Sequence, residues 1–247
     1  MTAALLAFYL GLIGLVVGCF LGLVSVRWPR GEGVVGGRSH CRSCHRVLSW
    51  PDLIPVASYV RALGRCRSCA APIPLRYPLI ELAAGGVGVW AALAGSTVPE
   101  AILTALLGWQ LLLVAVIDLE HQWLSVRPTL SLLVTGVTAA GVLDNLAIQD
   151  AVIGAAVGFA SLSAFRLVYR RWRGPHGLGK NDAILVGAAG AWVGWSGLPT
   201  VFLVASLAGL SLLLARRMPG RRYGLHGQMQ LASFLTGGVW LTWIMLL

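Results

Sequence analysis

Long uncharged apolar segments recur along the whole chain. Backbone polar groups inside a bilayer must pair within a helix, so an apolar run of about 17–25 residues predicts a membrane span. The run 183–215 is too long for one span, and Ser196-Gly197-Leu198-Pro199 is predicted to break it. Glu100 is predicted to lie in a tight turn between the second and third helices. The uncharged runs are 1–26, 82–99, 101–117, 128–143, 151–165, 183–215 and 223–247.

These runs predict an all-α polytopic membrane protein with about eight transmembrane helices, and the composition agrees. Hydrophobic residues make up 57% of the chain and charged residues 11%, whereas soluble domains carry about a quarter charged residues. A soluble enzyme, a disordered chain and a disulfide-stapled secreted domain are therefore excluded. Residues 1–26 carry no basic residue and exceed the apolar core of a signal peptide, so they are expected to stay as the first helix.

The basic residues are confined to alternate connections. All 19 Lys and Arg residues fall in segments 27–81, 118–127, 166–182 and 216–222. Connections rich in Lys and Arg stay in the cytoplasm, so these four segments are predicted to be cytoplasmic and both chain ends to lie outside. The net charge of +10 is then explained by topology and contact with anionic membrane lipids rather than by nucleic-acid binding.

Two CxxC pairs, Cys41/Cys44 and Cys66/Cys69, lie in the first cytoplasmic segment. Each pair can present two thiolates to one ion, and the two pairs complete a tetrahedral site that predicts structural zinc. The alternative is two disulfides, which a reducing cytosol disfavours. The predicted domains are a transmembrane helix at 1–26, a cytoplasmic zinc-binding loop at 27–81 and a seven-helix membrane domain at 82–247.

Two acidic residues stand at the cytoplasmic ends of apolar runs: Asp118 follows one and Asp182 precedes another. Carboxylates at membrane depth are costly and indicate function. Two that face each other can share a proton, so that one activates water while the other protonates a carbonyl oxygen. Each aspartate considered alone has an alternative explanation. Asp182 also suits the role of an acid that stabilises a helix N-terminus, and Asp118 that of an interfacial acid paired with Arg127 or His121.

Residues beside the two aspartates are candidates for substrate contact. Gly177 and Gly179 precede Asp182, and glycine permits close approach of a substrate backbone. Asn181 is adjacent to Asp182. Glu120, two residues beyond Asp118, is a lesser candidate.

Together these motifs resemble the prepilin leader peptidases, the GxGD-type aspartic proteases of bacterial inner membranes. The likeness implies that Asp118 and Asp182 are catalytic and that the membrane is a bacterial inner membrane, so that the outer side, where the charge pattern places both termini, is the periplasm. It also implies cleavage of type IV prepilins or type II secretion pseudopilins after a glycine, at the cytoplasmic face. Many members then methylate the new N-terminus with S-adenosylmethionine. The matching segments are 18–31, 48–55, 72–81, Ile117-Asp118-Leu119-Glu120-His121-Gln122, Gly179-Lys180-Asn181-Asp182 and 187–192.

The chain departs from the family pattern at three places. Asn181 replaces a glycine, Ile184 replaces a lysine, and 124–127 replace an expected Leu-Pro-Asp. Among residues other than glycine, asparagine best tolerates positive φ, so we expect Asn181 to preserve the local backbone and the activity. Two other functions stay open. One is a non-catalytic assembly factor of a secretion system; the other, less favoured because no internal repeat is visible, is a proton-coupled transporter.

Overall fold

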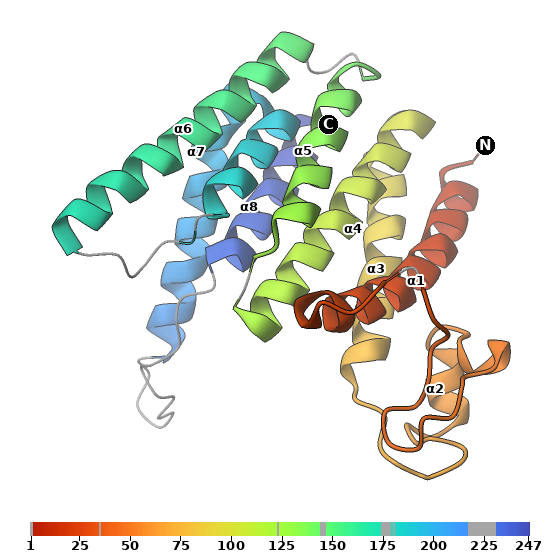
Figure 1. Cartoon of the computed structure of the whole chain (residues 1–247). Coiled ribbons are helices and arrows are strands. Elements are labelled where there is room, and N and C mark those ends of the chain that lie inside the picture. Colours follow the sequence, from red (N-terminus) through yellow and green to blue (C-terminus); the bar gives the residue numbers. More distant parts are fainter. Residues whose placement is uncertain are drawn as a thin grey trace. The chain divides into compact units, whose positions relative to one another are not determined.

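The computed structural model describes residues 2–34, 36–122, 124–143, 147–173, 179, 181–216 and 231–247. Helices dominate, and no strand occurs in these ranges (Figure 1). The chain forms two compact units, residues 1–112 and 113–247. The helices are α1 (Ala3–Arg27), η1 (Trp28–Arg30), η2 (Trp50–Asp52), α2 (Ala57–Arg61), α3 (Arg76–Ala94), α4 (Val98–His121), α5 (Val126–Ala140), α6 (Ile148–Arg173), α7 (Asp182–Arg216) and α8 (Leu231–Leu246).

Five of the helices in the described ranges, α1, α3, α4, α6 and α7, are long and apolar enough to cross a membrane, and α5 and α8 are shorter apolar helices. Large apolar side chains such as Phe8, Val16 and Leu207 are exposed on these helices. A soluble monomer rarely exposes so much apolar surface, whereas lipid tails accept it. The prediction of an all-α polytopic membrane protein is confirmed.

Helix α7 is divided in two, as the length of its apolar run predicts. The division lies at Gly194, which has φ 69° and ψ 174°, so the predicted position at 196–199 is wrong. Only glycine adopts this backbone conformation readily. Pro199 instead lies close to the start of the second half, where a missing N–H disturbs few helical hydrogen bonds.

The short turn predicted between the second and third long helices is present between α3 and α4. Glu100, however, lies in the first turn of α4 rather than in the turn itself. Its Oε2 accepts the N–H groups of Ser96 (2.8 Å) and Thr97 (3.0 Å). The Glu100 N–H in turn faces the Thr97 hydroxyl (3.4 Å). This reciprocal pair is a capping box, which explains an acid at this position.

In the first unit, α1 and α3 pack at very short range through small residues. A Cβ atom on Gly14 would lie 2.3 Å from the Ala84 carbonyl oxygen, and one on Gly88 would lie 2.1 Å from that of Leu10. Such contacts let two helix backbones touch, the usual means of helix association inside a membrane. Trp109 of α4 joins them, because its indole N–H donates to the Ala84 carbonyl (2.9 Å).

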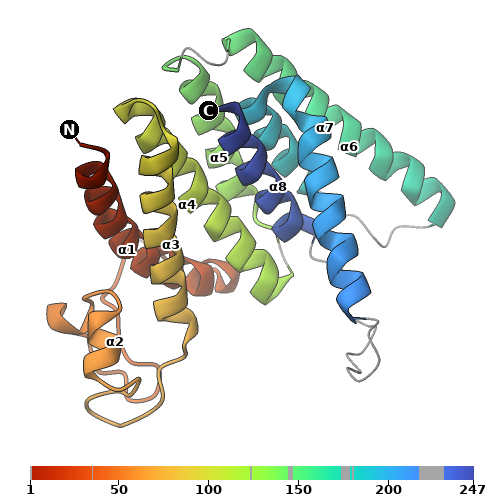
Figure 2. The ribbon, with the colours of Figure 1, turned by 180° about the vertical axis from the view of Figure 1, so that it is seen from behind.

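In the second unit, the first half of α7 lies between α5 and α6 (Figures 1 and 2). On one side, a Cβ on Gly154 of α6 would lie 2.3 Å from the Gly190 carbonyl oxygen. On the other side, the buried Trp192 indole N–H donates to the Leu132 carbonyl of α5 (2.9 Å). This close packing gives the start of α7, where Asp182 lies, a rigid support.

Candidate active site and cysteine cluster

The two CxxC pairs form two turns of the same shape. The Cys41 carbonyl accepts the N–H of His45 (3.0 Å), and the Cys66 carbonyl accepts that of Ala70 (2.9 Å). His45 and Ala70 therefore occupy equivalent positions, and both have positive φ, 56° and 57°. Each turn closes in the left-handed region, a conformation that L-residues adopt only when the surrounding structure requires it.

The four thiols from these turns converge on one point. Their sulfur atoms all lie within 4.8 Å of one another, with Cys41 to Cys69 at 3.9 Å and Cys44 to Cys66 at 4.0 Å. Four sulfurs around a tetrahedral ion with bonds of about 2.3 Å would be about 3.8 Å apart. A disulfide requires about 2.05 Å, and all four cysteines are free. The cluster is therefore a candidate metal site, and the disulfide alternative is not what the structure contains.

The pKa values of the thiols differ because their backbone donors and their thiol neighbours differ. The backbone N–H groups of Ser68 and Cys69 lower the pKa of Cys66 to about 6. The N–H of Ala71 favours the Cys69 thiolate, but burial and hydrogen bonds to the other three thiols outweigh it and raise the pKa of Cys69 to about 11. A divalent cation bound by all four sulfur atoms would require four thiolates and would displace the protons that remain on them.

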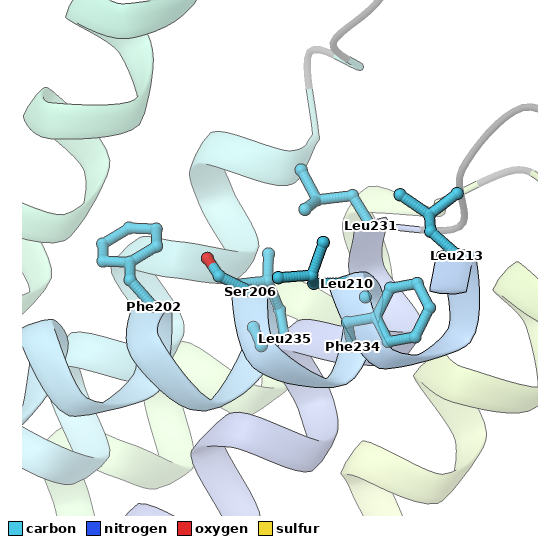
Figure 3. A pocket seen from close by; sticks show the side chains of 9 residues that line it. Phe202, Ser206, Leu210, Leu213, Leu231, Phe234 and Leu235 are labelled. Atoms are coloured by element: carbon cyan, nitrogen blue, oxygen red, sulfur yellow. The ribbon is translucent and has the colours of Figure 1, made fainter. Parts of the chain in front are cut away.

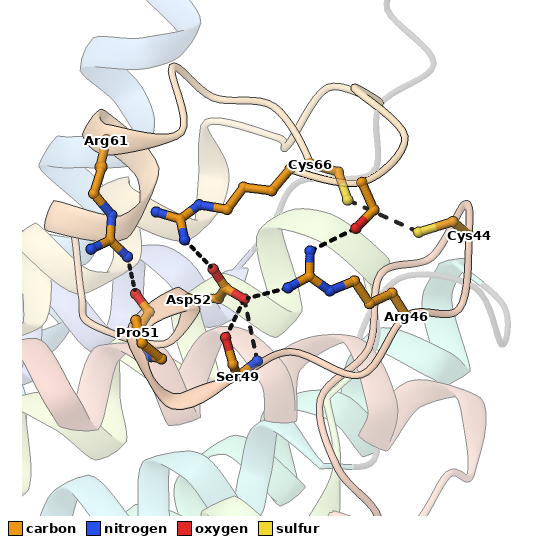
Figure 4. Close-up of polar contacts among 9 residues, drawn as sticks. Cys44, Arg46, Ser49, Pro51, Asp52, Arg61 and Cys66 are labelled. Atoms are coloured by element: carbon orange, nitrogen blue, oxygen red, sulfur yellow. Dashed lines mark hydrogen bonds and ion pairs between the residues drawn. The ribbon is translucent and has the colours of Figure 1, made fainter.

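Polar contacts centred on Asp52, which we call the Asp52 clasp, join the two turns without the help of an ion (Figure 4). The Asp52 carboxylate accepts the Ser49 hydroxyl (2.7 Å) and lies 3.7 Å from Arg46 and 3.4 Å from Arg67. The Ser49 hydroxyl bond and then the two guanidinium groups hold the pKa of Asp52 below its usual value. Arg46 also donates to the Ser68 hydroxyl of the other turn (2.6 Å). Asp52 is thus bound to two arginines of the loop, one from each turn.

The cysteine loop is also tied to the helices of its unit. The buried Glu81 carboxylate of α3 accepts the N–H of Val56 at 2.7 Å, and Val56 has a positive φ of 58°. A buried carboxylate needs such a donor to offset the loss of hydration. Glu81 therefore anchors the loop to α3.

Asp118 lies near the end of α4 and is 7% exposed. Its Oδ2 accepts two hydrogen bonds from Ser233 of α8, one from the backbone N–H (2.8 Å) and one from the side-chain hydroxyl (2.7 Å). His121, suggested above as a partner of Asp118, lies 3.9 Å from Glu120. Asp118 is therefore a buried carboxylate held by a neighbouring helix rather than a solvated interfacial acid.

Asp182 is the first residue of α7. Its Oδ2 accepts the N–H of Gly179 (2.9 Å), and its charge interacts with those of Asp118 and Arg166. The fold thus brings two carboxylates that are 64 positions apart in the chain within electrostatic reach of each other. A pair of this kind can share one proton, which is what general acid–base hydrolysis requires.

Asn181 does not adopt the positive φ expected from the sequence, since it is absent from the non-glycine residues of the described chain that do. Its side-chain amide instead donates a hydrogen bond to the Leu124 carbonyl, in the connection between α4 and α5. Asn181 therefore suits this position through its side-chain hydrogen bond rather than through tolerance of positive φ. The bond ties the start of α7 to the segment that follows Asp118.

The other candidate residues are placed differently. Gly179 contacts the Asp182 carboxylate directly. Glu120 is exposed, because two residues along an α-helix turn the side chain by about 200° away from the face of Asp118. Gly177 lies outside the described residues.

Sequence reasoning missed two residues, Ser233 and Arg166. Nothing in the local pattern marks Ser233, which is 115 positions from its partner. Arg166 was counted only as one of the cytoplasmic basic residues, yet its charge interacts with Asp182. Its Nε is also buried without a hydrogen-bond partner in the described structure.

An apolar pocket of about 300 Å³ lies elsewhere in the second unit, between the second half of α7 and α8 (Figure 3). The described residues that line it include no ionisable group, so it offers nothing that could activate water. The carboxylate pair, rather than this pocket, is the candidate reaction site. The lining residues are Phe202, Ala205, Ser206, Gly209, Leu210, Leu213, Leu231, Phe234 and Leu235.

Fold and site together define a polytopic membrane protein with paired aspartates at helix ends. Two family models match it: the bacterial peptidase A24 N-terminal domain over residues 12–94 and the type IV leader peptidase family over 105–214. The chain belongs to the type IV leader peptidase family.

Curated relatives share much of its length. A prepilin leader peptidase/N-methyltransferase of Myxococcus xanthus (strain DK1622) is 37% identical over 227 residues, which cover 88% of this chain and 66% of the relative. A type 4 prepilin-like proteins leader peptide-processing enzyme of Escherichia coli O78:H11 is 36% identical, with 80% of each chain covered. A prepilin leader peptidase/N-methyltransferase of Burkholderia pseudomallei (strain K96243) is 40% identical, covering 74% of this chain and 60% of the relative. No solved structure matches significantly.

Proposed function

We propose that this protein is a membrane aspartic endopeptidase that removes the leader peptide of type IV prepilins or type II secretion pseudopilins. The main support for this proposal is the pair Asp118 and Asp182, whose charges interact between the end of α4 and the start of α7. Membership of the type IV leader peptidase family supports it, as do relatives named for prepilin processing.

The proposed chemistry needs only the two carboxyl groups and solvent water. One carboxylate takes a proton from water, whose oxygen attacks the scissile carbonyl carbon, while the other carboxyl group protonates the carbonyl oxygen. The tetrahedral intermediate collapses, the C–N bond breaks and the leaving amine takes a proton. Gly179 and Asn181 are proposed to shape the approach of the substrate beside Asp182, with Gly177 and Glu120 as further contacts.

For the cysteine cluster we propose one structural zinc ion held by Cys41, Cys44, Cys66 and Cys69. The sulfur separations of 3.9 and 4.0 Å support tetrahedral thiolate binding. Four protein ligands leave no open position for water or substrate, so the ion would stabilise the loop and take no part in hydrolysis. The division into a helix at 1–26, a zinc loop at 27–81 and a membrane domain at 82–247 belongs to the same proposal.

Methyl transfer to the new N-terminus, with S-adenosylmethionine as donor, is the second part of the proposal. It is supported by the double names of relatives such as the Myxococcus and Burkholderia proteins. S-adenosylmethionine would supply an electrophilic methyl group.

We further propose that the protein lies in a bacterial inner membrane with both termini in the periplasm, because its basic residues share one side. In intact cells, a thiol reagent that cannot cross membranes should label a Leu247→Cys variant. Val60→Cys, in the exposed part of the cysteine loop, should be labelled only after the membrane is opened. Labelling of Val60→Cys in intact cells would reverse the orientation.

The function is tested by producing the chain with a candidate prepilin in a host that lacks its own prepilin peptidase. The expected result is a prepilin shortened by its basic leader, visible as a faster band. An Asp118→Asn/Asp182→Asn double variant, present at the same level in the membrane, should leave the prepilin uncut. If the wild-type chain cuts no prepilin of its source cell yet pilus or secretion assembly still requires it, the assembly-factor reading holds.

The Asn181 hydrogen bond leads to a separate expectation. Asn181→Gly restores the family residue but removes the amide donor to the carbonyl group of the buried residue Leu124. We expect it to cost about 1 kcal/mol and to lower the Tm of purified protein by about 2–4 °C. Asn181→Val should lose a similar amount, since both changes remove the same bond. A Gly variant that is more stable than the wild type, with a strongly destabilised Val variant, would restore the positive-φ explanation.

A further inference from the structure

Ser233, in the first turn of α8, is hydrogen-bonded to Asp118 near the end of α4. The Ser233 N–H lies 2.8 Å and its hydroxyl oxygen 2.7 Å from the same carboxylate oxygen, Oδ2. The hydroxyl is also 3.5 Å from the Ala115 carbonyl, but the shorter distance and the negative charge favour Asp118 as the acceptor. Ser233 therefore gives Asp118 two donors from one residue.

Two donors on one oxygen fix how the carboxylate is turned. Within the part of the chain that the structure describes, every hydrogen bond accepted by Asp118 goes to Oδ2. Oδ1 is thus the oxygen that can take a proton from water or share a proton with Asp182. The backbone donor belongs to the first turn of α8, where N–H groups have no partner within the helix.

We propose that Ser233 is a positioning residue that holds the Asp118 carboxylate in its reactive orientation from the start of α8. This inference rests on the proposed function, because it assumes that Asp118 is catalytic. Ser233 lies beyond both segments matched by the family models, 12–94 and 105–214. With Ser233 in this role, the last helix, α8, takes part in the reaction.

A structural role alone would affect folding, so the test separates turnover from stability. Ser233→Ala removes the hydroxyl donor and keeps the backbone donor. Because a small misplacement of a reacting group slows a reaction strongly, kcat for prepilin cleavage should fall about tenfold, with KM changed less than about twofold. Ser233→Thr keeps the hydroxyl and should restore most of kcat.

The matched control is Thr236→Val, one turn further along α8. The Thr236 hydroxyl donates to the Ser233 carbonyl of its own helix (2.8 Å), so the change removes a buried hydroxyl without touching Asp118. Its kcat should equal that of the wild type. A wild-type kcat in Ser233→Ala, or a loss confined to KM, would overturn the proposal.

A double-mutant cycle on Tm tests the contact without any substrate. Ser233→Ala should lower the Tm by about 2–4 °C when Asp118 is present and by much less in an Asp118→Ala background. Equal losses in both backgrounds would show that the hydroxyl does not act through Asp118 and would overturn the proposal. Should the wild type cleave no prepilin while this coupling persists, the proposed function fails and the Ser233–Asp118 contact stands.

Discussion

Replacing either Asp118 or Asp182 by asparagine is expected to reduce prepilin cleavage by about 10⁴-fold or more. Each change keeps the shape of the side chain but removes the group that takes or gives the proton. The two aspartates act on one water and one carbonyl, so the double variant should be no worse than either single variant. Initial rates with a purified prepilin, at matched enzyme concentration, provide the measurement.

The control for these variants is Asp150→Asn, the same chemical change in the first turn of α6. It should cleave at the wild-type rate, and all variants should reach the membrane in equal amounts. Full activity in Asp118→Asn or in Asp182→Asn would eliminate the two-aspartate mechanism.

The second large effect concerns the metal. Purified protein should contain about one zinc per chain, and a Cys41→Ser/Cys44→Ser variant should contain almost none. Structural zinc contributes about 10 kcal/mol or more to the folding of small domains. The loop at 38–72 should therefore become sensitive to proteases in the variant, although the Asp52 clasp to Arg46 and Arg67 would slow its opening.

Cys19→Ser is the matched change outside the cluster and should leave the zinc content unchanged. Elemental analysis and limited proteolysis of the same samples decide the outcome. Intact, active protein that carries disulfides at the four loop cysteines and no metal would refute the zinc proposal.

Hydropathy predicted the long helices because the bilayer constrains length and polarity so strongly. It predicted their ends less well. Helix α3 begins at Arg76 and α6 runs to Arg173, beyond the uncharged runs, because hydropathy marks only the part of a helix inside the apolar core of the bilayer, whereas the helix itself continues into the polar interface. The division of α7 was expected from its length, but the choice between Gly194 and Pro199 depends on backbone geometry that the pattern does not contain.

The candidate site was predictable where its chemistry is local. The CxxC spacing indicated a four-thiol cluster, and the position of each aspartate at the end of an apolar run singled it out. The partners of those aspartates could not be predicted in the same way. Ser233 reaches Asp118 only through the packing of α8, and Asn181 uses its amide as a long-range donor rather than its tolerance of positive φ. Such contacts join distant parts of the chain and leave no periodic signal.

One mass spectrum tests the central claim most directly. The purified protein would be reconstituted in lipid with a candidate prepilin, and the mass of the product would be read with and without S-adenosylmethionine. We expect a product that lacks the leader and begins immediately after the glycine at the cleavage site. With the methyl donor present, the proposed methyl transfer makes this product one methyl group heavier. A prepilin of unchanged mass, with a known family enzyme cutting the same sample, would contradict the assignment of this chain as a peptidase.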